Sequence, residues 1–357
     1  MDRFFQDFYR PGLLAEALLG QSPKPQVELG ASLPPKVKII SPEENGDVVA
    51  ATATVDVEVT DAGGGVQGPW LRQNGARVLA AGEKQKVDDT TYRQSFTVAL
   101  VEGENRLRVE AASADGSWES EPAELRLTLI RNLEKPVLHL LAVGVEKYAE
   151  GALNLQFCAD DAQALARLFE ERGQALYAGV RPHVLIDNQV TRDQLRAEIN
   201  AIADEAKPQD TLLVFLSGHA VTVGQRYYFI PHDMRREADS FEEDVRKWGV
   251  PGDTLADWIG SVPALKRMLI LDTCHSGAAV TLAGGRGRDP FAFRGAVERL
   301  SREQGIFTLA ASAADEQAAE VPALAHGLLT YTLLAGLKAV DGGPWPTSTS
   351  RRPTASK

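Results

Sequence analysis

Two patterns of hydrophobic and polar positions divide the 357-residue chain. From residue 36 to residue 131, apolar and polar residues alternate with a period of two, the pattern of strands with one buried face. Turns rich in Gly, Asp and Asn separate the alternating runs, which lie at 37–40, 51–59, 92–100, 105–111 and 125–129. Short strands at this spacing predict an all-β, immunoglobulin-like sandwich. The segment contains no cysteine and no histidine, so we expect a spacer or an interaction module.

After a linker at residues 131–136, the pattern changes to alternating strands and helices. Asp160 and Asp161 begin one helix and Gly173 ends it, and Thr191 with Gln194 forms a capping box that opens the next. This order predicts an α/β domain from 136 to 340, with a mostly parallel sheet and helices on both faces. We expect strands at 137–144, 183–186, 211–217, 268–271 and 306–311, a hairpin at 226–230, and helices at 160–173, 191–202, 254–262 and 327–339.

The remaining segments are rich in residues that break regular structure. Residues 1–35 read as a connector because prolines interrupt them near both 23 and 34. Residues 341–357 have the composition of a disordered tail, and the Gly- and Arg-rich stretch at 283–290 has that of a flexible loop.

Composition restricts the class of protein. The chain is 44% hydrophobic and 24% charged, as in soluble globular proteins, and its net charge of −11 argues against binding to nucleic acid. The N-terminus lacks a secretory signal, and no apolar run approaches 18 residues, so we expect no membrane segment. Two cysteines, Cys158 and Cys274, form no disulfide framework, which favours a reducing compartment and a cytoplasmic location.

Candidate chemistry lies where two buried strands end. The run at 268–271 stops at Asp272, and Cys274 follows at the carboxyl end of the strand, where α/β folds place reactive groups. A lone cysteine is usually a small buried hydrophobe, but a similar strand ends in Ser217, Gly218 and His219, 55 residues earlier. A thiol and an imidazole predict a His219–Cys274 dyad that cleaves amide bonds without a metal or cofactor. The backbone N–H groups of Gly218 and Cys274 are the expected oxyanion donors.

These motifs resemble one peptidase family. Leu-Ser-Gly-His at 216–219, together with Asp-Thr-Cys-His-Ser-Gly at 272–277, resembles the caspase-like cysteine peptidases, specifically the metacaspase branch. Residues 154–162 resemble the family's segment after its first strand, and the likeness covers about 136–340. The resemblance implies a cysteine endopeptidase with a caspase-like α/β fold, in which Cys274 is the nucleophile and His219 the general base or acid.

The resemblance also implies specificity for substrates with Arg or Lys before the scissile bond (the P1 residue). Asp161 and Asp272 match the acids that hold this side chain, and Ser217 matches a serine at the edge of the pocket. A guanidinium or ammonium group favours facing carboxylates in a partly dry pocket. Structural roles stay open, with Asp161 as a helix-capping carboxylate and Asp272 as a strand-end acceptor. The chain lacks the Gln-Ala-Cys signature of true caspases.

Several further expectations follow from the resemblance. Calcium activation would use surface acids, for which residues 239–244 are the candidates, although such a run is usually a solvated loop. A β-propeller or another protein partner is expected upstream of the sandwich. Ala220 replaces the family's usual glycine, and we expect extended chain there. Self-cleavage would occur in the loose segment after the cysteine, which contains Arg286, Arg288 and Arg294.

The other histidines and Cys158 carry weaker signals. His232 reads as part of a loop, His275 as structural, and Cys158 as a packing residue. No pair among His139, His183 and His326 has metal-ligand spacing, so we expect no metal site in the chemistry. A second hypothesis is a catalytically inactive caspase-like scaffold that binds partners through the sandwich and the former pocket.

Overall fold

The computed structural model describes residues 18–19, 33–80, 82–131, 134–224, 226–274, 305–311, 320–321 and 325–339. Most of the predicted connector, the 283–290 stretch with its arginines, His275 and the predicted tail lie outside these residues. In the part of the chain that is described, none of the helices has the length and apolar character needed to cross a bilayer.

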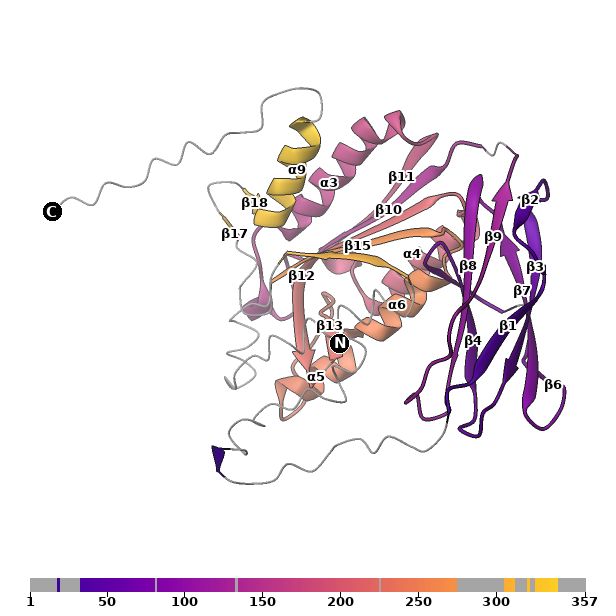
Figure 1. The fold of residues 1–357 in the computed structure, drawn as a ribbon. Coiled ribbons are helices and arrows are strands. Elements are labelled where there is room, and N and C mark those ends of the chain that lie inside the picture. Colours follow the sequence, from indigo (N-terminus) through magenta and orange to yellow (C-terminus); the bar gives the residue numbers. More distant parts are fainter. Residues whose placement is uncertain are drawn as a thin grey trace.

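Two sheets form the all-β region, as predicted (Figure 1). Their neighbouring strands are antiparallel except for β2 with β9. Alternate residues such as Val57, Phe96, Leu107 and Leu125 turn inward and form one buried core between the sheets. The first sheet has the order β1 (Lys36–Ser41), β3 (Thr52–Thr60), β7 (Thr91–Ala99) and β6 (Gln85–Lys86). The second has the order β2 (Gly46–Val48), β9 (Ala123–Leu129), β8 (Gly103–Ala112), β4 (Gln67–Gln73) and β5 (Ala76–Val78).

The sequence did not predict β2, β4, β5 or β6. Three of them have only two or three residues, and β4 places the polar Gln73 at a buried position. Gln73 Nε2 donates hydrogen bonds to Asn105 Oδ1 at 2.7 Å and to the carbonyl oxygen of Ala99 at 2.8 Å. These two hydrogen bonds satisfy the buried amide of Gln73. A polar residue at a buried position, however, interrupts the alternation of apolar and polar residues by which a strand is predicted.

A five-stranded parallel sheet organises the second half of the chain. Its order is β11 (Gly179–Ile186), β10 (Val137–Gly144), β12 (Thr211–Val223), β15 (Lys266–Cys274) and β16 (Phe307–Ala310). The helices α3 (Cys158–Arg172) and α9 (Leu328–Ala339) cover one face, where Leu165, Phe215 and Leu333 pack together. The helices α4 (Arg192–Glu205) and α6 (Gly252–Ser261) cover the other face (Figure 1). The predicted α/β arrangement, a mostly parallel sheet with helices on both faces, is confirmed.

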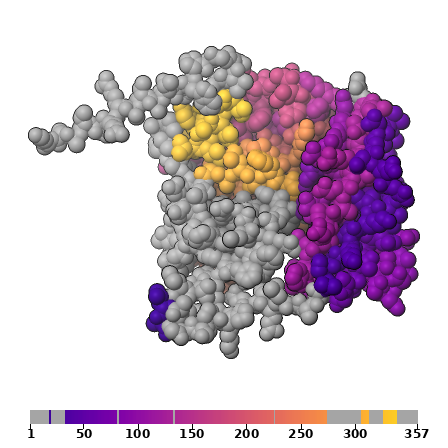
Figure 2. Space-filling model, in the orientation of Figure 1, coloured from indigo at the N-terminus to yellow at the C-terminus, as the bar shows by residue number. Residues whose placement is uncertain are grey.

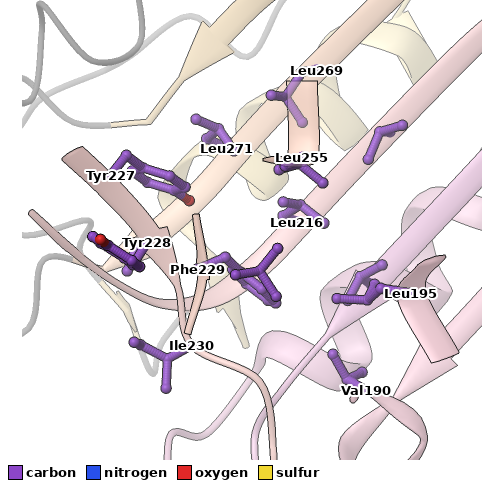
Figure 3. Packing of buried hydrophobic residues seen from close by; sticks show 14 of the residues in the cluster. Val190, Leu195, Leu216, Tyr227, Tyr228, Phe229, Ile230, Leu255, Leu269 and Leu271 are labelled. Carbon is purple, nitrogen blue, oxygen red and sulfur yellow. The ribbon is translucent and has the colours of Figure 1, made fainter. Parts of the chain in front are cut away.

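The strand β12 continues past His219, so the chain at Ala220 is extended, as predicted. Residues 220–223 pair with β13 (Arg226–Phe229), which pairs in turn with β14 (Val250–Pro251). Figure 3 shows the aromatic side chains of Tyr227 and Phe229 packed with Leu216 and Leu255 in the core below the sheet. The strands β13 and β14 therefore extend the sheet beside residues 220–223, the part of β12 that follows His219.

The acidic run at 239–244 is not the solvated loop that the sequence suggested, because it enters a helix, α5 (Phe241–Trp248). Ser240 Oγ caps this helix by accepting the N–H of Glu243 at 3.3 Å. Asp244 is buried and accepts the N–H groups of Glu237 and Ala238 at 3.0 and 2.9 Å. The acids stabilise the first turn of a helix, where they complement its dipole.

Short elements complete the described structure. Three 3₁₀ turns lie at Gly151–Leu153, Gly173–Ala175 and Asp187–Gln189. A two-stranded ribbon, β17 (Glu320–Val321) with β18 (His326–Gly327), immediately precedes α9.

The sandwich packs along one side of the α/β part (Figure 2). Gly305, just before β16, has a φ of +67°, and a Cβ atom there would lie 2.1 Å from the carbonyl oxygen of Gly75 in the β4–β5 turn. Two backbones therefore meet directly at this point, which only glycine permits. An ion pair of 2.8 Å between Lys207 and Glu134 also joins the start of the α/β part to its body.

A second close approach places α3 against the sheet. Gly144 ends β10, and a Cβ atom on it would lie 2.1 Å from the carbonyl oxygen of Cys158, the first residue of α3. The first turn of α3, with Asp161, therefore packs directly on the sheet backbone.

We expect Gly144→Ala to destabilise the fold by about 1–3 kcal/mol or more, because the added methyl group must push α3 away from β10. Gly151→Ala is the matched control, since nothing lies within 4 Å of a Cβ atom there, and it should change stability by less than about 0.5 kcal/mol. Urea unfolding of the two variants measures the difference. Equal stabilities would show that the helix does not rest on this glycine.

Candidate active site

The register of the parallel sheet brings the two predicted strand ends together. Along β12 and β15, Ser217 pairs with Asp272 and His219 pairs with Cys274. On the other side of β12, Gly144 pairs with Ser217. Because neighbouring strands lie about 4.8 Å apart, the backbones of His219 and Cys274 are adjacent at the carboxyl edge of the sheet.

One hydrogen bond orients the buried imidazole of His219. Its Nε2 atom lies 2.8 Å from the carbonyl oxygen of Leu153 in the β10–α3 loop. A carbonyl oxygen only accepts hydrogen bonds, so Nε2 carries the proton. In the neutral ring, Nδ1 then bears the lone pair and can accept a proton.

Tyr148, from the same loop, holds the backbone of the histidine. Its hydroxyl oxygen accepts the N–H of His219 at 2.8 Å, and its ring lies 5.1 Å from the imidazole, centroid to centroid. Gly218 has a φ of +151°, and a Cβ atom there would lie 3.0 Å from the Tyr148 hydroxyl. Glycine therefore allows tyrosine and histidine to approach. No sequence motif marks Tyr148 or Leu153 as a partner of the histidine.

The β10–α3 loop is itself fixed at several points. Asn154 Oδ1 accepts the N–H of Tyr148 at 2.8 Å. Asp187, in the turn after β11, accepts the N–H groups of Glu146 and Lys147 with one oxygen, both at 2.9 Å. The loop thus has the rigidity needed to hold an imidazole in one orientation.

The two predicted pocket carboxylates converge on one point from different elements. Asp161 of α3 is 2% exposed and Asp272 of β15 is 3% exposed. A Cβ atom on Gly327 would lie 3.0 Å from Asp161 Oδ2 and 2.9 Å from Asp272 Oδ2. Ser217, also buried, is the register partner of Asp272. The structure therefore groups all three residues that the resemblance assigned to the pocket.

Both carboxylates accept hydrogen bonds from the segment at 326–330, which joins β18 to α9. Asp161 accepts the N–H of Gly327 at 3.1 Å, and its second oxygen lies 2.7 Å from Nδ1 of His326. Asp272 accepts the N–H of Thr330 at 3.1 Å and its hydroxyl at 2.5 Å. Asp272 thus has the strand-end acceptor role that the sequence left open. Asp161 does not cap α3, whose N-cap is Phe157.

Burial controls the ionisation of Asp161. Loss of hydration raises its pKa to about 7, and the negative charge of Asp272 adds to the effect. The His326 side chain and the Gly327 N–H oppose the rise.

The other candidates have structural partners. His139 is buried beside Asp210 at 3.4 Å, and His183 lies 2.7 Å from Glu198. His232 binds the carbonyl oxygen of Lys147 in a loop. Cys158 is buried in the first turn of α3, where the sequence predicted packing. The oxyanion donors Gly218 and Cys274 stay predictions.

The described residues do not fit a preformed calcium site. Within them, no three side chains of the types His, Cys, Asp and Glu come close enough to hold a metal ion. Of the predicted acids, Asp244 is engaged with backbone N–H groups and Glu242 pairs with Arg246 at 3.3 Å.

The raised pKa of Asp161 predicts a pH-dependent stability. The folded state retains the Asp161 proton up to about pH 7, whereas the unfolded chain loses it near pH 4. Its contribution is therefore complete below pH 4 and is lost as the pH rises to 7. Relative to Asp161→Asn, the wild type should lose on the order of 2–4 kcal/mol over this range.

Chemical unfolding between pH 4 and 8 measures this difference. Asp160→Asn is the control, because it removes an exposed carboxylate from the same helical turn. Parallel pH profiles for the wild type and Asp161→Asn would contradict the effect of burial.

Three solved structures show partial similarity to the chain. Protein GSU0716 from Geobacter sulfurreducens is 19% identical over 59% of this chain and 84% of its own, with a TM-score of 0.40. Dimeric latent PorU from Porphyromonas gingivalis is 15% identical over 32% of this chain and 12% of its own, with a TM-score of 0.24. The PKD domain of an M14-like peptidase from the Thermoplasmatales archaeon SCGC AB-540-F20 is 14% identical over 28% and 94%, with a TM-score of 0.19. At these scores, none of the three supports a conclusion about the site.

No curated protein sequence matches the chain. The family model of the caspase domain, peptidase family C14, matches residues 139–344, which are more than half of the chain and include the parallel sheet, both strand ends and α9. The chain therefore belongs to the caspase domain family of cysteine peptidases.

Proposed function

We propose that the protein is a cysteine endopeptidase of the metacaspase type that cleaves after Arg or Lys with a His219–Cys274 dyad. The observation that carries this proposal is the register pairing of His219 with Cys274 on adjacent parallel strands. The Leu153 carbonyl oxygen supports it, because it selects the histidine tautomer that accepts a proton at Nδ1.

In the proposed reaction, Nδ1 of His219 takes the Cys274 thiol proton, and the thiolate attacks the carbonyl carbon of the scissile bond. The N–H groups of Gly218 and Cys274 stabilise the resulting oxyanion. The carbon–nitrogen bond breaks as the imidazolium gives its proton to the leaving amine, which leaves a thioester. A water molecule, deprotonated by His219, hydrolyses the thioester and regenerates the thiol.

The proposed specificity depends on Asp161 and Asp272. Their side chains enter one place from α3 and β15, with Ser217 beside Asp272 in the sheet register. A buried pair of carboxylates has a strong electrostatic preference for a cation, and a guanidinium can bind carboxylates through two parallel hydrogen bonds. These properties support Arg or Lys as the P1 residue.

We also propose that the sandwich joins the peptidase domain to an upstream β-propeller or another protein partner. Its residues contain no histidine and no cysteine, and it contacts the α/β part where Gly75 meets Gly305. The alternative, an inactive scaffold, would not need an imidazole whose orientation is held by a hydrogen bond at Nε2.

The first test is hydrolysis of fluorogenic peptides with Arg, Lys or Asp at P1, with and without calcium. We expect cleavage after Arg and Lys, and a loss of at least about 10³-fold in kcat/KM for Cys274→Ala and for His219→Ala. Cleavage after Asp would retain the nucleophile but overturn the acidic pocket. Failure to cleave any peptide under either condition would support the scaffold.

A second prediction concerns Tyr148. Removal of its hydroxyl leaves the buried N–H of His219 without its acceptor, so we expect Tyr148→Phe to lower kcat about tenfold with little change in KM. Tyr177→Phe is the matched control, because that ring packs on the α3 face of the sheet, away from the histidine. A higher KM with unchanged kcat would show that Tyr148 acts on substrate binding instead.

A further inference from the structure

One segment of the chain supplies hydrogen-bond partners to both pocket carboxylates. Within the described chain, residues 326–330 supply two backbone N–H groups, one hydroxyl and one imidazole to Asp161 and Asp272. Gly327 lies between the carboxylates, where a side chain would be too close to both. The place proposed for a substrate cation is thus already bordered by the protein's own chain.

His326 differs from the other members of this segment. Among the described residues it is the one basic side chain that reaches Asp161, and its imidazole is 24% exposed whereas Asp161 is 2% exposed. The imidazole therefore forms the outer wall of the carboxylate cluster, towards solvent. It brings at most one positive charge to two buried carboxylates.

We propose that His326 determines the specificity of this pocket by competing with the substrate's basic side chain for Asp161. This inference rests on the proposed function, because it assigns a residue to the same pocket. A P1 side chain must replace the His326 hydrogen bond before it can pair with Asp161. Arginine is suited to this exchange, since its planar fork offers two parallel N–H donors, whereas the lysine ammonium is a point charge. Neutral P1 side chains lack a charge to exchange.

The exchange needs only a local movement. The Asp272 contacts to Thr330 hold the first turn of α9 and can persist when the His326 side chain rotates away. One hydrogen bond, between Nδ1 and Asp161, has to break, and the imidazole is already partly in solvent. Rotation of a partly exposed side chain is rapid compared with turnover.

The electrostatics of the cluster indicate that the neighbours of Asp161 compensate its negative charge only in part. Asp161 is faced by Asp272 from β15 and by His326 from β18, and its pKa is about 7 even with His326 in place. A fully compensated carboxylate would have a pKa below its ordinary value. A permanently charged guanidinium therefore stabilises ionised Asp161 more than the imidazole does.

The test is a binding titration that needs no turnover. N-acetyl-argininamide and N-acetyl-lysinamide are titrated at pH 7 into the full chain carrying Cys274→Ala, with and without His326→Asn. Asparagine retains an N–H donor near the position of Nδ1 but cannot carry the charge. We expect His326→Asn to bind the arginine probe about tenfold more tightly, because a charge-assisted hydrogen bond no longer has to be displaced, and to reduce the preference for arginine over lysine.

Two controls make the result specific. His183→Asn breaks a similar histidine–carboxylate pair, of 2.7 Å to Glu198, and should leave the affinity unchanged. Asp161→Asn should weaken binding in both backgrounds. Melting curves verify that each variant is folded, and His326→Gln replaces His326→Asn if the latter is not.

Unchanged or weaker binding in the folded His326 variant would overturn the inference and leave His326 a structural residue. Binding that does not depend on Asp161, or no binding of either probe, would also overturn it. The proposed peptidase activity is tested separately, since an enzyme that cleaves after another residue would pass the hydrolysis assay and fail this one. A scaffold without activity could still bind the probes.

Discussion

The hydrogen-bond ladder between β12 and β15 is the constraint on which the site depends. Nine consecutive residue pairs run from Thr211 with Lys266 to His219 with Cys274. A slip of one residue would move every side chain to the opposite face of the sheet, so the apolar side chains of both strands specify the register through their burial. Leu213 and Phe215 face α3, whereas Val214 and Leu216 face α4 and α6. The core thus determines which residues meet at the strand ends.

The site has a rigid half and an adjustable half. Two hydrogen bonds to the β10–α3 loop hold the histidine, and the one to the Leu153 carbonyl oxygen determines its tautomer. The carboxylates are buried at an energetic cost that the 326–330 segment offsets in part. Catalytic groups gain from a fixed orientation, and a binding pocket gains from partners that a ligand can replace.

Much of the arrangement could be predicted because it depends on local patterns. Buried apolar runs located the parallel strands, the aspartates and the glycine at the two ends of 160–173 located α3, and the capping box at Thr191 located α4. The ends of two such strands were enough to bring His219 and Cys274 together. The long strands of the N-terminal sandwich followed from alternation, whereas the three shortest strands and β4, where Gln73 is buried against Asn105, did not. The acidic residues at 239–244 were interpreted as a loop, because Ser240 was not recognised as the N-cap of α5.

The remainder depends on contacts between distant parts of the chain. His326 lies 165 positions from Asp161 in sequence, and no local pattern connects them. Tyr148 and Leu153 lie in an irregular loop whose path depends on Asp187 and Asn154. Such contacts follow from the packed fold and become visible only with it.

The acceptor that orients His219 is a main-chain carbonyl, and this has a consequence for how the site can vary. Every amino acid supplies such an oxygen, so substitutions at position 153 that fit the core keep the orienting group. In this protein the group that orients the imidazole therefore depends on the path of the β10–α3 loop and not on the identity of a side chain.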